Sequence, residues 1–115
     1  MKTSSAKSKG RRLQQWVRDQ ILETFKHLEQ DDVRSTSMGA GGMDVQLSPA
    51  AKKVFPFAVE CKNQESLNVW KAFEQAESNN NGLEPMLVIK KNGKAPLVVL
   101  DADWLLENIH KMTRG

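Results

Sequence analysis

The chain has 115 residues, which is enough for one domain with a single hydrophobic core. Its composition, 39% hydrophobic and 27% charged, excludes collagen-like, disordered and coiled-coil proteins. The single cysteine, Cys61, excludes a disulfide framework within the chain and a Cys-rich zinc site. The net charge is +3, and six lysines and arginines precede the first acidic residue, Asp19. This basic leading segment favours either a polyanionic partner or a solvated tail.

The first predicted elements are a flexible arm and an amphipathic helix. Residues 1–9 are rich in Ser and Lys and contain almost no large apolar side chain, so we expect a flexible basic arm. Residues 10–29 carry apolar side chains at spacings of three and four, which predicts a helix. Gln14 falls on the apolar stripe of this helix. A buried amide needs partners, so Gln14 either borders a polar cavity or is a satisfied boundary residue.

The middle of the chain alternates short strands with loops. Residues 33–36 form a possible short strand, and residues 37–42 form a glycine-rich loop without the spacing of a nucleotide cradle. Alternation predicts a strand over residues 43–47. Residues 48–53 are expected as a turn or hairpin loop, and residues 54–61 as a second strand.

The last part of the chain is predicted to form a helix, a β-hairpin and a second helix, in that order. A helix is expected over residues 67–78, with Leu67, Trp70, Phe73 and Ala76 on its inward apolar face. Strands over residues 86–89 and 96–100 flank Asn-Gly, the signature of a type I′ turn, and a final helix follows over residues 101–111, capped by Asp101 or Asp103. The order α-β-β-β-α-β-β-α predicts a single α/β domain over residues 10–115, in which helices flank a mixed central β-sheet.

Three charged residues on two predicted strands form a candidate catalytic cluster. Glu60 and Lys62 are two positions apart, so they share one face of a strand. If the two strands pair as a hairpin, Asp44 lies beside Glu60. Two adjacent carboxylates repel each other, and a hard divalent cation resolves that repulsion. A neighbouring lysine can orient the attacking water and stabilise charge on a phosphate. On an exposed strand, the same pattern is a weak surface ion pair.

Gly-Met-Asp44 followed by Val-Glu60-Cys-Lys62 resembles the motif of the PD-(D/E)XK nucleases. The helix-first layout and Ser37-x-Gly before the Asp strand are similar to the Holliday-junction resolvases of archaea and phages. The resemblance implies a restriction-endonuclease-like fold and a Mg²⁺-dependent phosphodiesterase acting on DNA, with Mn²⁺ as a substitute. It covers about residues 9–100.

The resemblance also implies roles for individual residues. Asp44 and Glu60 would hold the metal with the backbone carbonyl of Cys61, and Lys62 would assist the water. Resolvases of this kind place a Glu near position 14, so Gln14 is a tentative metal ligand that brings no charge. The expected DNA contacts are Lys9, Arg11, Arg12, Ser37, Asn63, Gln64 and Gln75.

We therefore expect a structure-selective DNA endonuclease that acts as a homodimer. The alternatives are a nicking or restriction-like nuclease on simple duplex DNA, a catalytically weak DNA-binding module of the same fold, and a small basic interaction protein. No apolar run is long enough to span a bilayer, and no secretion signal is apparent. A cytoplasmic location, in a bacterial, archaeal or phage-infected cell, is the matching expectation.

Overall fold

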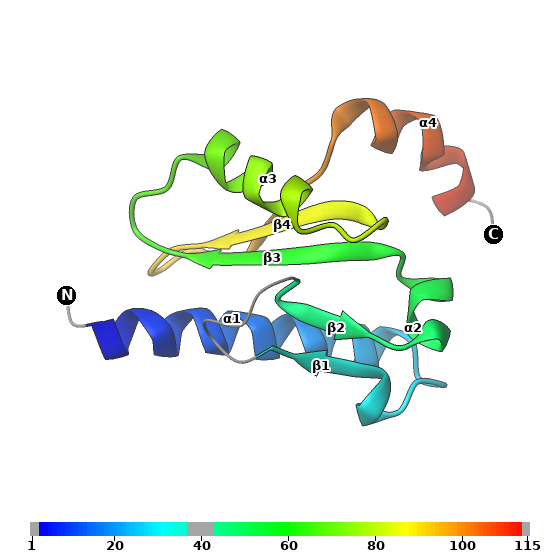
Figure 1. Ribbon diagram of the computed structural model, residues 1–115, viewed down its shortest axis with the longest axis horizontal. Helices are drawn as coiled ribbons and strands as arrows, with labels where there is room; N and C mark the ends of the chain where they lie inside the picture. Colours follow the sequence, from blue (N-terminus) through cyan, green and yellow to red (C-terminus); the bar gives the residue numbers. More distant parts are fainter. Residues whose placement is uncertain (1–2, 37–42, 114–115) are drawn as a thin grey trace.

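A computed structural model of the chain describes residues 3–36 and 43–113. Its elements, in chain order, are α1 (Thr3–Thr24), the 3₁₀ turn η1 (Gln30–Asp32), β1 (Val33–Ser35), β2 (Val45–Leu47), α2 (Pro49–Val54), β3 (Phe57–Asn63), α3 (Val69–Ser78), β4 (Glu84–Lys90), β5 (Leu97–Val99) and α4 (Ala102–Met112) (Figure 1).

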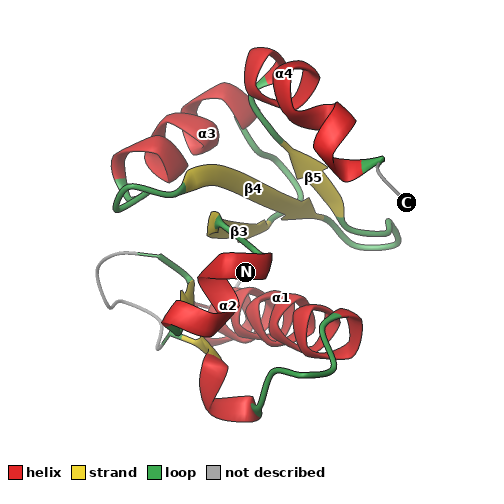
Figure 2. Ribbon diagram, turned by 90° about the vertical axis from the view of Figure 1, so that its right-hand side faces the viewer, coloured by secondary structure: helices red, strands yellow, loops and turns green. Residues whose placement is uncertain are grey.

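The strands form a mixed three-stranded sheet and a separate two-stranded pair. The sheet has the order β3-β4-β5, in which β3 and β4 run parallel and β4 and β5 antiparallel. The crossover between β3 and β4 is α3, as expected for parallel neighbours. Strands β1 and β2 pair antiparallel beside this sheet. Helix α1 lies on one side of the sheet and α3 and α4 lie on the other (Figure 2). A single α/β domain with a mixed sheet between helices is thus confirmed.

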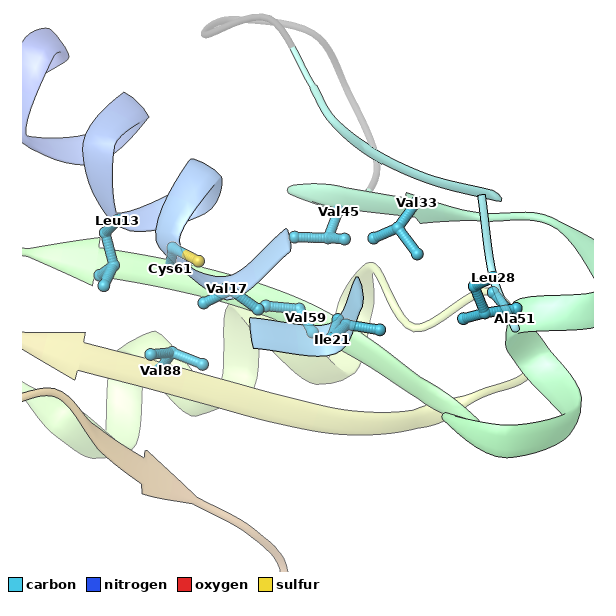
Figure 3. Close-up of a cluster of buried hydrophobic side chains, with 10 residues drawn as sticks. All are labelled: Leu13, Val17, Ile21, Leu28, Val33, Val45, Ala51, Val59, Cys61 and Val88. Carbon is cyan, nitrogen blue, oxygen red and sulfur yellow. The ribbon is translucent and has the colours of Figure 1, made fainter. Parts of the chain in front are cut away.

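The core lies between α1 and the strands. Leu13, Val17 and Ile21 of α1 are buried, which confirms the apolar stripe predicted from the sequence. Figure 3 shows them against Val59 and Cys61 of β3, with Val45 and Val88 in the same cluster. Because side chains alternate along a strand, Glu60 and Lys62 project from the opposite face of β3. The core therefore fixes which way the acid and the lysine point.

Helix α1 begins much earlier than expected. It starts at Thr3, so the described part of the predicted arm is helical. Lys9 is 8% exposed, and its Nζ lies 3.3 Å from Glu65 Oε2. The Glu65 carboxylate, far along the chain, stabilises the amino-terminal turns of α1, which the local composition did not predict. At its other end α1 stops at Thr24, and Leu28 is buried beyond it.

The expected turn over residues 48–53 is wrong, because a helix, α2, occupies this segment. Ser48 is its N-cap, since the hydroxyl accepts the N–H of Ala51, and Pro49 occupies the first turn. Both are favoured at a helix start. As a result, β2 and β3 are not joined as a hairpin.

Two further expectations are corrected in the second half. The Asn92-Gly93 turn is not type I′, because Gly93 has a positive φ, of 76°, and Asn92 does not. The Lys94 N–H donates to the Lys91 carbonyl, and a positive φ at the second central residue alone matches a type II turn. Trp70 is 82% exposed, not inward, because α3 packs on its small residues, Ala72 and Ala76.

Candidate active site

Backbone and side-chain hydrogen bonds to β3 hold Asp44. Its N–H donates to the Val59 carbonyl at 2.9 Å, and its Oδ2 accepts the N–H of Cys61 at 2.7 Å. Its own carbonyl accepts the N–H of Thr36. The Asp44 carboxylate is thus fixed against the edge of β3 beside Glu60, although β2 and β3 form no ladder.

Glu60 lies in the middle of β3 and is 4% exposed. Its Oε2 lies 3.8 Å from the Nζ of Lys62, whose side chain is 22% exposed. Its Oε1 is buried and has no hydrogen-bond partner within the part of the chain that the structure describes. Leaving a buried carboxylate oxygen without a hydrogen bond costs free energy, so a bound ligand at Oε1 would stabilise the site.

The two carboxylates are both harder to ionise than usual. Burial is the main cause that raises the pKa of Asp44, against the Cys61 N–H, Lys62 and Gln14, which lower it. Burial also raises the pKa of Glu60, and the charge of Asp44 raises it further, while Lys62 lowers it. Burial likewise raises the pKa of the Cys61 thiol, so this group is not a nucleophile at neutral pH. A cation bound between the two carboxylates would instead lower the pKa of Asp44 and of Glu60.

Two amides complete the surroundings of the carboxylates. Gln14 of α1 is 3% exposed and lies close enough to the Asp44 carboxyl to lower its pKa by hydrogen bonding. The expectation that Gln14 borders this cluster therefore agrees with its position. Asn79, the C-cap of α3, lies close enough to Glu60 to lower its pKa by hydrogen bonding. Asn79 directly follows the predicted helix over residues 67–78, and the parallel β3-α3-β4 crossover brings it back to β3.

The donor set suits a hard cation that keeps part of its water. Across residues 3–36 and 43–113 no group of three or more His, Cys, Asp or Glu side chains could hold a metal. Two carboxylates suffice for Mg²⁺, which retains waters and adds phosphate oxygens. The N–H and C=O of one strand residue point to the same side, so the Cys61 carbonyl shares the edge of Asp44. Together with Glu60 Oε1, which accepts no hydrogen bond from any described residue, these residues fit the metal that the sequence resemblance implies.

The expected DNA contacts fall into three groups. Arg11 and Arg12 are exposed on α1, and Gln64 is exposed after β3. Lys9 and Asn63 instead tie α1 to β3, since the Asn63 amide donates to the Lys9 carbonyl at 3.0 Å. Gln75 is exposed on α3, and Ser37 lies outside the described residues.

Sequence reasoning missed a group of lysines at the β4-β5 turn. Lys90, Lys91 and Lys94 line a hollow that also includes Gln64. Arg12 and Lys90 line a neighbouring hollow that includes Asn63. We call Arg12, Lys90, Lys91 and Lys94 the basic end. The Asn-Gly turn signal located these lysines but did not indicate that they flank the end of β3.

Comparison with protein-family models, with curated proteins and with solved structures finds no match for this chain. The resemblance to PD-(D/E)XK nucleases therefore stays an expectation from the motif residues of the sequence. In the described residues no helix is sufficiently long and apolar to cross a membrane.

Proposed function

We propose that the protein is a Mg²⁺-dependent DNA endonuclease that hydrolyses phosphodiester bonds. The observation that carries this proposal is the pairing of Asp44 with a buried Glu60 next to Lys62, where Glu60 Oε1 has no hydrogen-bond partner among residues 3–36 and 43–113. Two carboxylates held together at an energetic cost, with a lysine beside them, are typical of sites for metal-assisted phosphoryl chemistry.

Each residue of the cluster has a distinct role in this proposal. Bound Mg²⁺ would act as a Lewis acid on the scissile phosphate and lower the pKa of a coordinated water. Asp44 and Glu60 supply the negative charge that holds the cation, and the Cys61 N–H fixes the orientation of Asp44. Lys62, kept near Glu60, is positioned to orient the attacking water and to stabilise charge on the phosphate.

The basic end provides a surface for the DNA backbone. It lies at the carboxyl end of β3, just beyond Lys62, so phosphates bound there would lead a strand toward the cluster. The sequence carries no helix-turn-helix or zinc-finger signature, which favours recognition of DNA shape over base reading. We therefore favour branched DNA, as in a Holliday-junction resolvase, over the simple duplex of a nicking or restriction-like enzyme.

A second candidate is a catalytically weak DNA-binding module of the same fold. The observation in its favour is Gln14, an uncharged amide at the position beside Asp44 where resolvases of this kind place a Glu. Such a module would bind DNA through the basic end and would show little or no cleavage.

One experiment separates these candidates. Purified protein is incubated with matched four-way junction, flap, duplex and single-stranded DNA, with Mg²⁺ or with EDTA. Asp44→Asn and Glu60→Gln should abolish cleavage and leave DNA affinity equal or higher, because repulsion of phosphate falls. Glu23→Gln, an exposed carboxylate of α1, is the matched control and should cleave normally. Cleavage that persists in EDTA or in Glu60→Gln contradicts the site, whereas binding without cleavage in the wild type supports the weak module.

A further inference from the structure

The hollow at the β4-β5 turn combines lysines with an apolar lining. Its volume is about 520 Å³, within the range of pockets that hold small organic groups. The segments around it are the loop before α3, the start of α3 and the β4-β5 turn. Lys90, Lys91 and Lys94 of the basic end line it. Four side chains form what we call the apolar lining: Leu67, Val69, Ile89 and Leu97.

The apolar lining shares one face of the sheet with Lys62. Lys62 pairs with Ile89 across β3 and β4, and Ile89 pairs with Leu97 across β4 and β5. Paired side chains of neighbouring strands point to the same face. Because neighbouring strands are about 4.8 Å apart, Leu97 lies about 10 Å from Lys62 across the sheet. A DNA strand with one phosphate beside Lys62 and Glu60 would therefore carry a neighbouring nucleotide over the hollow.

The chemistry of the hollow indicates a nucleotide rather than a phosphate alone. Lysines bind phosphate, but a phosphate gains nothing from contact with Leu97, which is 63% exposed. A nucleobase has two flat faces, and proteins that take a base out of its stack hold it between apolar or aromatic side chains. Glu65 also lines the hollow, but it accepts hydrogen bonds from Lys9 and from the Asn92 N–H, so its charge is offset. The hollow thus favours an anionic occupant with an apolar part.

We propose that this hollow binds an unpaired nucleotide of the DNA substrate, with its base on Ile89 and Leu97 and its phosphates on Lys91 and Lys94. A base inside a duplex is paired and stacked, so the occupant comes from a bulge, a flap or an open branch point. The inference rests on the proposed function for its ligand, DNA, and adds the structural feature of DNA that is selected. DNA with an unpaired nucleotide beside the scissile phosphate is then preferred to a perfectly paired duplex.

The first test measures binding in EDTA, so that no DNA is cut. Two duplexes are compared by fluorescence anisotropy: one has a single bulged 2-aminopurine nucleotide, and the other has an abasic nucleotide at the same place. They carry the same phosphates and differ only in the base. The wild type should bind the base-bearing bulge about tenfold more tightly, and the emission of 2-aminopurine should change as its base enters the hollow.

Substitutions separate the contact with the base from the contact with phosphate. Leu97→Gln should remove the preference for the base and leave the affinity for the abasic duplex unchanged, whereas Leu97→Phe should keep the preference. Leu106→Gln is the matched control, since Leu106 of α4 is 69% exposed and does not line the hollow. Lys94→Gln should weaken binding of both duplexes by the same factor, because both carry the same phosphates. Circular dichroism checks the fold of each variant, and exposed Leu97 should tolerate substitution.

The outcomes distinguish this inference from the proposed nuclease activity. Equal affinity of the wild type for the two bulges, or a preference that survives Leu97→Gln, would overturn the nucleotide site even if the protein cleaves DNA. Displacement of the bulged duplex by micromolar dAMP would also overturn it, because the hollow would then serve a free nucleotide. A preference lost only in the Leu97→Gln variant would support the site even if Mg²⁺ produces no cleavage. In a protein that does cleave, cuts should cluster beside the bulge, and a cut position independent of the bulge would contradict the proposal.

Discussion

Glu60→Gln should make the metal-free protein more stable and should remove most of its response to Mg²⁺. Glu60 is buried, one of its oxygens has no partner in the described part of the chain, and the charge of Asp44 opposes its ionisation. Gln has nearly the same shape, carries no charge and can donate a hydrogen bond to Asp44. The substitution thus relieves repulsion in the absence of metal and removes a ligand in its presence.

The size of both effects follows from the contacts of Glu60. An unsatisfied buried polar group costs about 1–3 kcal/mol, and the ion pair with Lys62 that would be lost is long, at 3.8 Å, and worth at most about 1 kcal/mol. A net gain of about 1 kcal/mol should raise the Tm by about 4 °C for a domain of this size. Mg²⁺ at about ten times its Kd should stabilise the wild type by about 1.4 kcal/mol. A tenfold weaker site would gain only about 0.4 kcal/mol.

The assay is thermal unfolding of wild type, Glu60→Gln and the control Glu23→Gln, in EDTA and in Mg²⁺, at several pH values. Because burial raises the pKa of Asp44 and of Glu60, the folded state binds protons more tightly than the unfolded state. Metal-free wild type should therefore lose stability as pH rises from their ordinary pKa values through the raised ones. Glu60→Gln should lose less stability than the wild type over the same rise in pH. A variant that melts below the wild type in EDTA and keeps an equal Mg²⁺ shift would refute the reasoning.

Four further variants test Gln14 beside the cluster, the basic end and the ion pair between Lys9 and Glu65. Gln14→Glu adds a carboxylate next to Asp44, so it should lower the Tm of the metal-free protein and enlarge the Tm shift on adding Mg²⁺. It should also reduce the Mg²⁺ concentration needed for cleavage. An equal Tm shift in the wild type and the variant would exclude residue 14 as a metal ligand. Lys91→Gln and Lys94→Gln should each reduce the slope of log affinity for DNA against log salt concentration by about one unit, and an unchanged slope would remove the basic end from the DNA surface. Glu65→Gln should lower the Tm at neutral pH, because it leaves the buried Lys9 ammonium without its carboxylate partner. Hydrogen bonding to the Asn92 N–H and to Lys9 lowers the pKa of Glu65. The Tm difference between variant and wild type should therefore disappear as pH falls through that lowered pKa.

Local sequence patterns were sufficient to predict those features of the fold and site whose physical cause is local. Spacings of three and four identified the buried stripe of α1, and Asp101 caps α4 as one of the two candidates predicted. The alternation rule correctly put Glu60 and Lys62 on one face of β3. Helix α2 also has a local signal in Ser48-Pro49, whose capping chemistry favours a helix start, although the polar lysines that follow favour a turn or hairpin loop.

Other features depended on residues far apart in the chain, and only the tertiary structure decided them. A periodic pattern shows which residues share a face but not what covers that face, so Trp70 was expected inside and is exposed. Lys9 is helical and buried because Glu65, 56 positions away, neutralises it. Asn79 reaches Glu60 only through the parallel crossover. Asp44 lies beside Glu60, as hairpin pairing of the two strands would place it, but through hydrogen bonds to Val59 and Cys61. A side-chain carboxylate can bridge to a strand edge where the backbone ladder is absent.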